Sequence, residues 1–542
     1  MKHNYLTFVA LCLAGWLALT TNTAVQAATF TVTNTNDSGA GSLRNQIAAA
    51  AANPGPDTIN FAASLSGQTI ALTSGELSIN HDVTIDGSAL AERLTIDGQN
   101  NTGRILYIVD GTVTIDSLRF INGDSNDGDP GDDDGDGGAI HIAYATSVTI
   151  QNSEFSGNQS QYNGGALYIL QSPITLTNNT FTNNSTQHAG GAIRNADGAF
   201  AVNITNNTFV GNWADTGAAI WLSGGAEVIA NNTFSNNRDV LAVYNNAPTP
   251  LQLNNNTFLG TDGVFARSAG AVLHMRNNII GDCQLNGGSI GTNTNNWIVN
   301  GSCSPAYSGN PQLGPLADNG GPTQTAAPLP GSGVLDAGDN ATCTTNDQRG
   351  MPRRDGNGDS VVTCDLGAYE GGTMQCGVGA GNSYPFPNQS GVSILVNSEV
   401  NLDCLYVDEI PVSHPNATGV SEGQDLRTGK YWLIGGLQTD KTSTATFNVD
   451  LTLPYASASA STRACKWLDG AGPGFGWNCE DGAMGTTFDL GTSVTRQGVT
   501  AFSQWAVGDG VGPTAVTNLQ ADTTPRTGQG WLVGLLVGLM GA

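Results

Sequence analysis

The sequence predicts an all-β protein, a parallel β-helix (solenoid) followed by a small β-sandwich-like module. Two repeated features predict this fold class. Phenylalanines recur at a period near 26 residues through the first half of the chain, and a Gly-Gly-Ala-aliphatic element precedes most of them. A unit of this length holds two or three short strands and cannot bury its apolar face alone. Successive units therefore stack around one continuous core.

The spacing of the phenylalanines selects the kind of solenoid. Consecutive phenylalanines from Phe155 to Phe258 are 26, 28, 25 and 24 residues apart. This period is too short for a four-stranded propeller blade, and the units lack the leucine pattern of a horseshoe. We expect residues 28–310 to form one solenoid, with four phenylalanines stacked inside it. These are Phe155, Phe181, Phe209 and Phe234.

Asparagines occur at two fixed offsets from the phenylalanines. Equivalent residues of stacked coils lie about 4.8 Å apart, so their amides can hydrogen-bond along the stack. Asparagine also tolerates the left-handed backbone conformation of tight turns. We therefore expect asparagine columns in the turns. Three residues before the phenylalanines lie Asn152, Asn178, Asn206, Asn231 and Asn255, and three residues after them lie Asn158, Asn184, Asn212 and Asn237.

The N-terminal region predicts export and a cap for the solenoid. Residues 1–27 have the form of a secretory signal peptide, with Lys2, an apolar run and a small-residue cleavage site at Val25-Gln26-Ala27. A helical run follows and ends at Asn53-Pro54. A helix near residues 41–52 would cover the open strand edges at the start of the stack.

Charge and cysteine content narrow the function further. The net charge of −26 argues against a nucleic-acid partner, which requires a basic surface. Eight cysteines remain after the signal peptide, an even number that suits disulfides in an exported chain. Nearest-neighbour pairing is the simplest connectivity. It gives Cys283–Cys303, Cys343–Cys364, Cys376–Cys404 and Cys465–Cys479.

The C-terminal part differs in character from the repeats. Residues 373–510 contain short alternating runs broken by glycine and proline, which predicts a β-sandwich-like module. Residues 511–530 have the composition of a linker. The apolar tail at 531–542 is about half the ~20 residues that span a bilayer, so no firm transmembrane span is predicted. A sorting tail, a truncated anchor and a buried strand remain alternatives for it.

Three groups of motifs resemble those of bacterial surface proteins. Residues 41–47 (GSLRNQI) resemble the CSLREA N-terminal motif, with Gly41 in place of cysteine. The Gly-Gly-Ala and Phe-x-x-Asn pairs resemble the repeats of chlamydial polymorphic outer-membrane proteins. Residues 310–339, with 347–350 and 364–370, resemble the choice-of-anchor Q domain, assigned here to 311–372. The resemblance implies a secreted right-handed parallel β-helix, often on a cell surface, without one family-wide activity.

One candidate ligand site is an outward column on the Gly-Gly-Ala strands. Aligning these strands places His141, Tyr168, Arg194 and Trp221 at one position, opposite in parity to the aliphatic residues that precede them. Stacked aromatic and planar polar groups suit sugar rings or a partner surface. An ordinary exposed strand face is the alternative interpretation.

The case for catalysis rests on few residues. Glycoside hydrolysis needs two carboxylates about 5–9.5 Å apart, and no pair of acids is expected at the repeat spacing. His188 and Asp215 are 27 residues apart and can be neighbours on adjacent coils, and Arg194 is the arginine best placed to neutralise a uronate. The leading interpretation is therefore an exported or cell-surface adhesin or envelope structural or binding protein. A polysaccharide lyase or glycoside hydrolase is the alternative.

Calcium is the one cofactor that the sequence suggests. Asp355, Asn357 and Asp359 resemble the start of a calcium-binding loop, and Asp365 is a possible later ligand. The acidic segment 124–136 is a second candidate. A glycine-rich surface turn and a solvated charge run are the respective alternatives.

Overall fold

The structure, a computed structural model, describes most of the chain between residues 27 and 509. The predicted signal peptide, linker and apolar tail lie almost wholly outside this part. The described residues are 27–100, 103–125, 135–196, 200–225, 227–238, 241–319, 321–329, 332–351, 353, 363–371, 373–386, 389–410, 425–426, 430–437, 446–456, 458, 462–468, 476–479, 486–489, 492–501 and 504–509.

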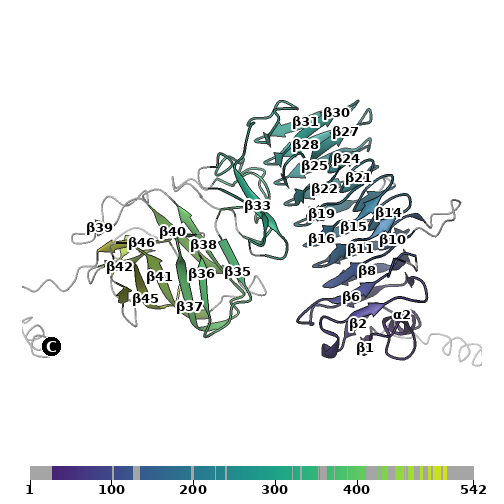
Figure 1. Cartoon of the computed structure of the whole chain (residues 1–542), viewed down its shortest axis with the longest axis horizontal. Coiled ribbons are helices and arrows are strands. Elements are labelled where there is room, and N and C mark those ends of the chain that lie inside the picture. The colour runs from purple at the N-terminus through teal and green to yellow at the C-terminus, as the bar shows by residue number, and fades with distance from the viewer. Residues whose placement is uncertain are drawn as a thin grey trace, which may run out of the picture.

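Residues 29–298 form a parallel β-solenoid whose coils pass in turn through sheets C, A and B (Figure 1). The predicted parallel β-helix is thus confirmed. Sheet A consists of β1 (Thr29–Val32), β2 (Asp57–Phe61), β5 (Val83–Asp86), β8 (Thr112–Asp116), β11 (Ser147–Gln151), β15 (Ile174–Thr177), β19 (Val202–Thr205), β22 (Glu227–Ala230), β25 (Pro250–Asn254), β28 (Val272–Arg276) and β31 (Ser289–Thr294).

The other two sheets have the same parallel order. Sheet B consists of β3 (Thr69–Ala71), β6 (Leu94–Asp97), β9 (Leu118–Ile121), β12 (Glu154–Ser156), β16 (Thr180–Thr182), β20 (Thr208–Val210), β23 (Thr233–Ser235), β26 (Thr257–Phe258), β29 (Ile279–Ile280) and β32 (Trp297–Ile298). Sheet C consists of β4 (Leu77–Asn80), β7 (Leu106–Asp110), β10 (Ile140–Ala143), β14 (Leu167–Leu170), β18 (Ile193–Asn195), β21 (Ile220–Leu222), β24 (Val243–Asn245), β27 (Gly263–Ala266) and β30 (Asp282–Leu285). Two short strands, β13 (Gln159–Ser160) and β17 (Ser185–Thr186), pair in a turn.

Helix α2 (Leu43–Ala51) covers the N-terminal end of the solenoid. The Ser42 side chain caps it by accepting a hydrogen bond from the amide of Asn45. Its buried face, Leu43, Ile47 and Ala50, packs against β1, β2 and β4. The 3₁₀ turn η1 (Ala63–Leu65) follows β2.

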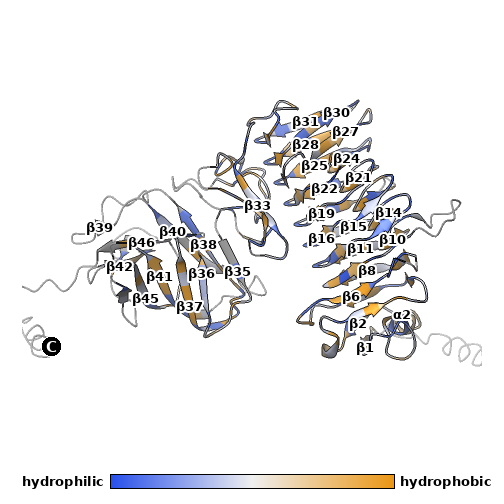
Figure 2. Cartoon of the chain, viewed as in Figure 1, coloured by the Kyte–Doolittle hydropathy of each residue, from blue (hydrophilic) through white to orange (hydrophobic). Residues whose placement is uncertain are grey.

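The phenylalanines form one stack inside the solenoid, as predicted. The four expected members are fully buried, and neighbouring ring centroids among them lie 4.9 Å apart. Their ring planes are within 7° of parallel. The stack continues to Phe120 at one end and Phe258 at the other. Along the strands, apolar residues alternate with polar ones, and the apolar set fills the core (Figure 2).

Two ladders of buried asparagines run along the solenoid between the sheets. One ladder lies after sheet B and uses the predicted residues three positions after the phenylalanines. Its side chains bond from coil to coil, for example from Asn184 Nδ2 to Asn212 Oδ1 at 3.0 Å and from Asn212 Nδ2 to Asn237 Oδ1 at 2.9 Å. Each oxygen also accepts the backbone amide of the preceding coil's asparagine. Asp262 replaces asparagine at the last step.

The second ladder is one residue away from the predicted column. The asparagines three residues before the phenylalanines adopt the left-handed conformation, with φ between 52° and 59°, as expected. The side chains that point inward belong instead to the next residue. This ladder consists of Asn179, Asn207, Asn232, Asn256, Asn278 and Asn296, all fully buried.

Residues 311–371, called here the return segment, fold back along the solenoid. Its hairpin, β33 (Leu313–Ala317) and β34 (Thr325–Pro328), and the chain that follows lie against sheet B and the adjacent turn. Gln348 is fully enclosed, and its side chain bonds Thr208 at 2.9 Å and Thr233 at 2.6 Å. The left-handed asparagines donate to or accept from this segment, for example Asn255 from the amide of Thr344 at 3.3 Å.

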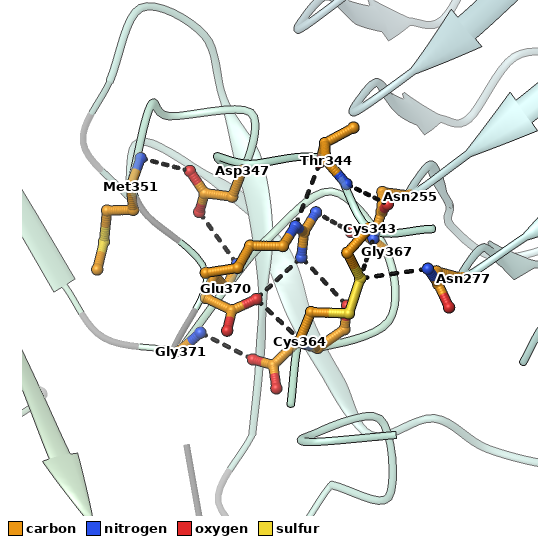
Figure 3. Close-up of polar contacts among 12 residues, drawn as sticks. Asn255, Asn277, Cys343, Thr344, Asp347, Met351, Cys364, Gly367, Glu370 and Gly371 are labelled. Carbon is orange, nitrogen blue, oxygen red and sulfur yellow. Dashed lines mark hydrogen bonds and ion pairs between the residues drawn. A yellow bond between two sulfur atoms is a disulfide. The ribbon is translucent and has the colours of Figure 1, made fainter. Parts of the chain in front are cut away.

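A buried ionic cluster holds the return segment together (Figure 3). Asp347 and Arg349 are paired at 2.8 Å with both side chains fully buried. Glu370 pairs with Arg353 at 2.9 Å. The carboxylate of Asp347 also accepts the amides of Met351 and Glu370. Because each buried charge has an opposite charge and hydrogen bonds, the desolvation cost is offset.

The last part of the chain forms two antiparallel sheets that share one core, including Trp432 and Trp505. One sheet contains β35 (Thr373–Cys376), β38 (Cys404–Ile410), β39 (Asp425–Leu426), β40 (Tyr431–Leu437), β42 (Thr462–Leu468), β43 (Gly476–Asn478) and β46 (Gln504–Asp509). The other contains β36 (Ser383–Phe386), β37 (Val392–Val400), β41 (Thr446–Pro454), β44 (Thr486–Asp489) and β45 (Ser493–Val499).

Three of the four expected local disulfides are present, namely Cys283–Cys303, Cys343–Cys364 and Cys465–Cys479. Cys404 is also disulfide-bonded, and β35 places Cys376 opposite it in register. The side chain of Cys376 lies outside the described part. Among the described helices, none has the length and apolar character needed to cross a membrane.

Replacing Asn212 by alanine tests the ladder. The change removes the acceptor for the backbone amide and Nδ2 of Asn184, and it removes the donor to the Phe181 carbonyl. Buried polar groups left unpaired cost about 1–3 kcal/mol each. We expect the free energy of opening of β16 and β20, measured by amide hydrogen exchange, to fall by about 2–4 kcal/mol.

The matched control is Asn203→Ala in the same coil. Asn203 lies at an outward-facing position of β19, between Val202 and Ile204, which point into the core. Its replacement should change the opening free energy by less than about 0.5 kcal/mol. Equal losses in the two variants would contradict a special role for the buried ladder.

Candidate functional site

The four residues of the predicted ligand column are in register on sheet C. His141 pairs with Tyr168, Tyr168 with Arg194, and Arg194 with Trp221. The preceding aliphatic residues point into the core. The column is longer than the four residues predicted from the sequence. The full set, called here the sheet C row, is Tyr107, His141, Tyr168, Arg194, Trp221, Tyr244 and Phe265.

Neighbouring side chains of the sheet C row pack against one another's ring faces. The Arg194 guanidinium lies 3.2 Å from the centroid of the Trp221 ring, and Tyr244 stacks against Trp221 at 6.0 Å with planes 10° apart. His141 packs edge-on between Tyr107 and Tyr168. A sugar ring stacks on a free aromatic face. The middle of the row therefore offers mainly ring edges, and stacking explains these contacts without a ligand.

The first part of the row is also covered. His141 is only 1% exposed and Tyr168 only 8%. Arg104 lies 2.6 Å from His141 Nδ1 and forms an ion pair with Glu76 at 2.8 Å. His141 and Tyr168 are therefore covered, and ligand binding by the column stays a prediction.

A cavity of about 530 Å³ lies at the C-terminal end of the row. Tyr244 and Phe265 lie 4.9 Å apart with planes tilted by 57°, so they do not cover each other as flat neighbours do. Polar groups complete the wall. The cavity is lined by Asn237, Leu241, Tyr244, Thr261, Phe265, Asp282 and Gln284.

The polar groups of this cavity are held in place. Asp282 Oδ2 accepts from Gln284 at 2.6 Å, and Asp282 Oδ1 accepts from Asn300 at 2.6 Å. The hydroxyl of Tyr244 accepts from Arg267 at 3.0 Å. Aromatic and fixed polar groups thus line one open depression, an arrangement that can contact a small ligand.

A comparison with known families agrees with this geometry. The family described as "Right handed beta helix region" matches residues 73–280. These residues form a right-handed parallel β-helix. No curated protein matches the chain significantly. The match covers the repeats and ends before the return segment.

The β-helix places the three predicted catalytic residues on two different faces. His188 and Asp215 are exposed and lie directly before the bridged pair Ala189 and Thr216, so they are neighbours on adjacent coils. Arg194 lies in the sheet C row, where its Nη1 donates to Ser223 at 2.6 Å and to the Asn195 carbonyl. Burial lowers the pKa of Arg194 to about 10, which leaves it a cation at neutral pH.

The expectation that no acids pair at the repeat spacing is wrong. Asp86 and Asp116 are register partners on β5 and β8, with backbones on the order of 5 Å apart. The repeated string Val-Thr-Ile-Asp at 83–86 and 113–116 is the signal that identifies them. Asp116 accepts from Gln151 at 2.7 Å and from Asn152 at 2.9 Å. These donors use its oxygens as acceptors, whereas hydrolysis needs one carboxyl group that gives a proton.

A second carboxylate that sequence reasoning missed lies inside the core. Glu227 occupies an inward position of β22, between Val202 and Leu251 on the neighbouring strands, and is 1% exposed. Its Oε1 accepts from Asn195 Nδ2 at 3.2 Å. Burial raises the pKa of Glu227 to about 8, so the group is mostly protonated at neutral pH.

The predicted calcium ligands fall mostly outside the described part of the chain, as does most of the acidic segment 124–136. Of the loop residues Asp355, Asn357, Asp359 and Asp365, only Asp365 is described. It is buried, and its carboxylate accepts the amides of Asp336 at 2.7 Å and Gly371 at 2.8 Å. Burial and the nearby Glu370 raise the pKa of Asp365. Calcium binding stays a prediction.

Glu227 makes the stability of the β-helix dependent on pH. Its folded pKa, about 8, lies above its ordinary value of 4.5. The stability from the bound proton is therefore fully present below about pH 4.5 and is lost as pH rises through 8. In Glu227→Gln, the fall in unfolding free energy between pH 6.5 and 8.5 should shrink by roughly 1–2 kcal/mol. Denaturant unfolding at both pH values measures it.

The control for this experiment is Glu92→Gln. Glu92 is exposed, so its replacement should leave the pH dependence unchanged. An identical pH dependence in wild type and Glu227→Gln would show that Glu227 is ionised, or solvated, in the folded protein.

Proposed function

We propose that the protein is an exported β-helix scaffold of the cell surface or envelope that binds a neutral saccharide without transforming it. The cavity at the C-terminal end of the sheet C row carries this proposal. It is the place where aromatic side chains of the row meet fixed polar groups in one hollow.

The chemistry of the cavity favours an uncharged sugar. Phe265 can pack against the apolar face of a sugar ring, while Asp282 and Gln284 can exchange hydrogen bonds with its hydroxyls. Tyr244 and Asn237 lie behind them and are buried. An acidic sugar would meet the Asp282 carboxylate and a chain of net charge −26. Like charges repel, so uronate polymers are disfavoured.

Export is supported by the sequence at the start of the chain and by the disulfides. The predicted signal peptide directs secretion, and local disulfides such as Cys283–Cys303 and Cys465–Cys479 persist in oxidising compartments. The resemblance of the N-terminal motif, the repeats and residues 311–372 to bacterial surface proteins favours a location on the cell surface. A surface protein, in place of a polysaccharide, is the other partner class consistent with this location.

Binding to a panel of neutral oligosaccharides tests the proposal. We expect Phe265→Ala to weaken binding of the recognised sugar at least about tenfold, because the aromatic wall is lost. Tyr107→Ala, at the opposite end of the same row, is the matched control and should retain full affinity. Isothermal titration calorimetry measures both. Binding that is equally weakened in both variants, or absent for every neutral sugar, would contradict the proposed site.

A glycoside hydrolase is the second candidate, favoured by the Asp86–Asp116 pair. A polysaccharide lyase would depend on Arg194, which is engaged with Trp221 and Ser223. The same panel can be assayed for reducing and unsaturated ends, and we expect no turnover. Turnover abolished by Asp116→Asn would establish the hydrolase, and turnover abolished by Arg194→Ala would establish the lyase.

A further inference from the structure

Asp57 is a carboxylate in a column of inward-facing positions whose other members are apolar, apart from Glu227 on a later coil. It lies at the start of β2, and its inward-facing register partner on the next coil is Val83. The side chain is 2% exposed. A buried carboxylate is costly unless an opposite charge or several hydrogen bonds compensate it.

The hydrogen bonds around Asp57 are unevenly distributed. Its Oδ1 accepts from Asn53 Nδ2 at 2.8 Å and from the backbone nitrogen of Ala28 at 2.8 Å. Its Oδ2 is buried and has no hydrogen-bond partner among the described residues. The nearby titratable group is His81, whose pKa is lowered by burial. Asp57 is therefore a buried carboxyl group whose two hydrogen bonds come from neutral donors and go to the same oxygen.

Ala28 is the residue at which the solenoid begins. Its carbonyl accepts the amide of Thr58 at 2.9 Å, which joins it to β2, and its nitrogen is directed at Asp57. Ala27, one residue earlier, is exposed. The predicted cleavage point after Ala27 thus coincides with the first residue that the solenoid holds in place.

We propose that cleavage between Ala27 and Ala28 creates a buried ion pair between the new amino terminus and Asp57. Hydrolysis of this peptide bond gives water's hydroxyl to the Ala27 carboxyl group and leaves an amine on Ala28, which takes up a proton. The resulting ammonium replaces one neutral donor with a positive charge and three donors, enough to serve both oxygens of Asp57. Removal of the leader thereby completes the N-terminal end of the solenoid.

This inference rests on the proposed export, but the ion pair is testable separately. A full mature chain can be released from a fusion partner so that it starts at Ala28, or at Ala27. The Ala27 form is a matched control because it keeps the Ala28 N–H donor and moves the charge one residue away. Both forms are also made with Asp57→Asn, which completes a double-mutant cycle.

We expect the chain that starts at Ala28 to exchange amide hydrogens of β1 and β2 at least about tenfold more slowly than the chain that starts at Ala27. This difference should vanish in Asp57→Asn. Two results would overturn the ion pair. One is equal exchange in the Ala28 and Ala27 chains that both keep Asp57. The other is a difference between those two starts that persists in Asp57→Asn.

N-terminal sequencing of protein collected outside the producing cell tests the processing step. Ala28 as first residue supports the proposal, and any other first residue overturns cleavage at this bond. If the chain is not exported, the proposed cell-surface location is wrong, and the double-mutant cycle still tests the ion pair. If export and cleavage occur but the cycle shows no coupling, only the ion pair is wrong and the proposed function stands.

Discussion

The buried asparagine amides between the coils are the interaction on which the rest of the structure depends. A coil of about 26 residues closes only through tight turns, and these turns bury backbone groups that water cannot reach. Asn184, Asn212 and their equivalents donate to a carbonyl of the preceding coil and accept a backbone amide and a side-chain amide from it. The phenylalanine stack has the same coil spacing, which the parallel strand pairing sets and the ladders maintain through the turns.

The same turns also attach the return segment. A turn residue in the left-handed conformation directs its own side chain outward and the side chain of the next residue inward. Each turn therefore has an inner side, which carries the ladder, and an outer side, which carries the left-handed asparagine. On the later coils the outer side is covered: Asn231, Asn255 and Asn277 bond residues 339–353. The buried threonines of sheet B, such as Thr233, meet Gln348. The return segment thus occupies sheet B and the adjacent turn on these coils.

The sheet C row shows how a repeat restricts its own function. Equivalent residues on successive coils lie at stacking distance, so planar side chains pack against one another's faces. Those faces are then not available to a ligand. Arg194 on Trp221 is the clearest case. Only where the row ends, at Phe265, do ring faces and polar groups meet in a cavity. A binding site at an end of such a row therefore has a physical reason.

By itself the sequence determined the parallel β-helix, the phenylalanine stack and the row that runs from His141 to Trp221, because a stacked coil repeats its pattern at a fixed period. It also determined three of the four local cysteine pairs. The tertiary structure alone decided which asparagine of each turn faces inward, since that depends on one backbone dihedral angle. It also decided that Arg194 and Trp221 cover each other, and that Asp57 faces Ala28. Asp86 and Asp116 became neighbours because the loop between their strands lengthens the period there. Contacts such as Asp57 with Ala28 and Asp86 with Asp116 occur once and at spacings outside the repeat period. The periodic pattern of the sequence therefore does not predict them.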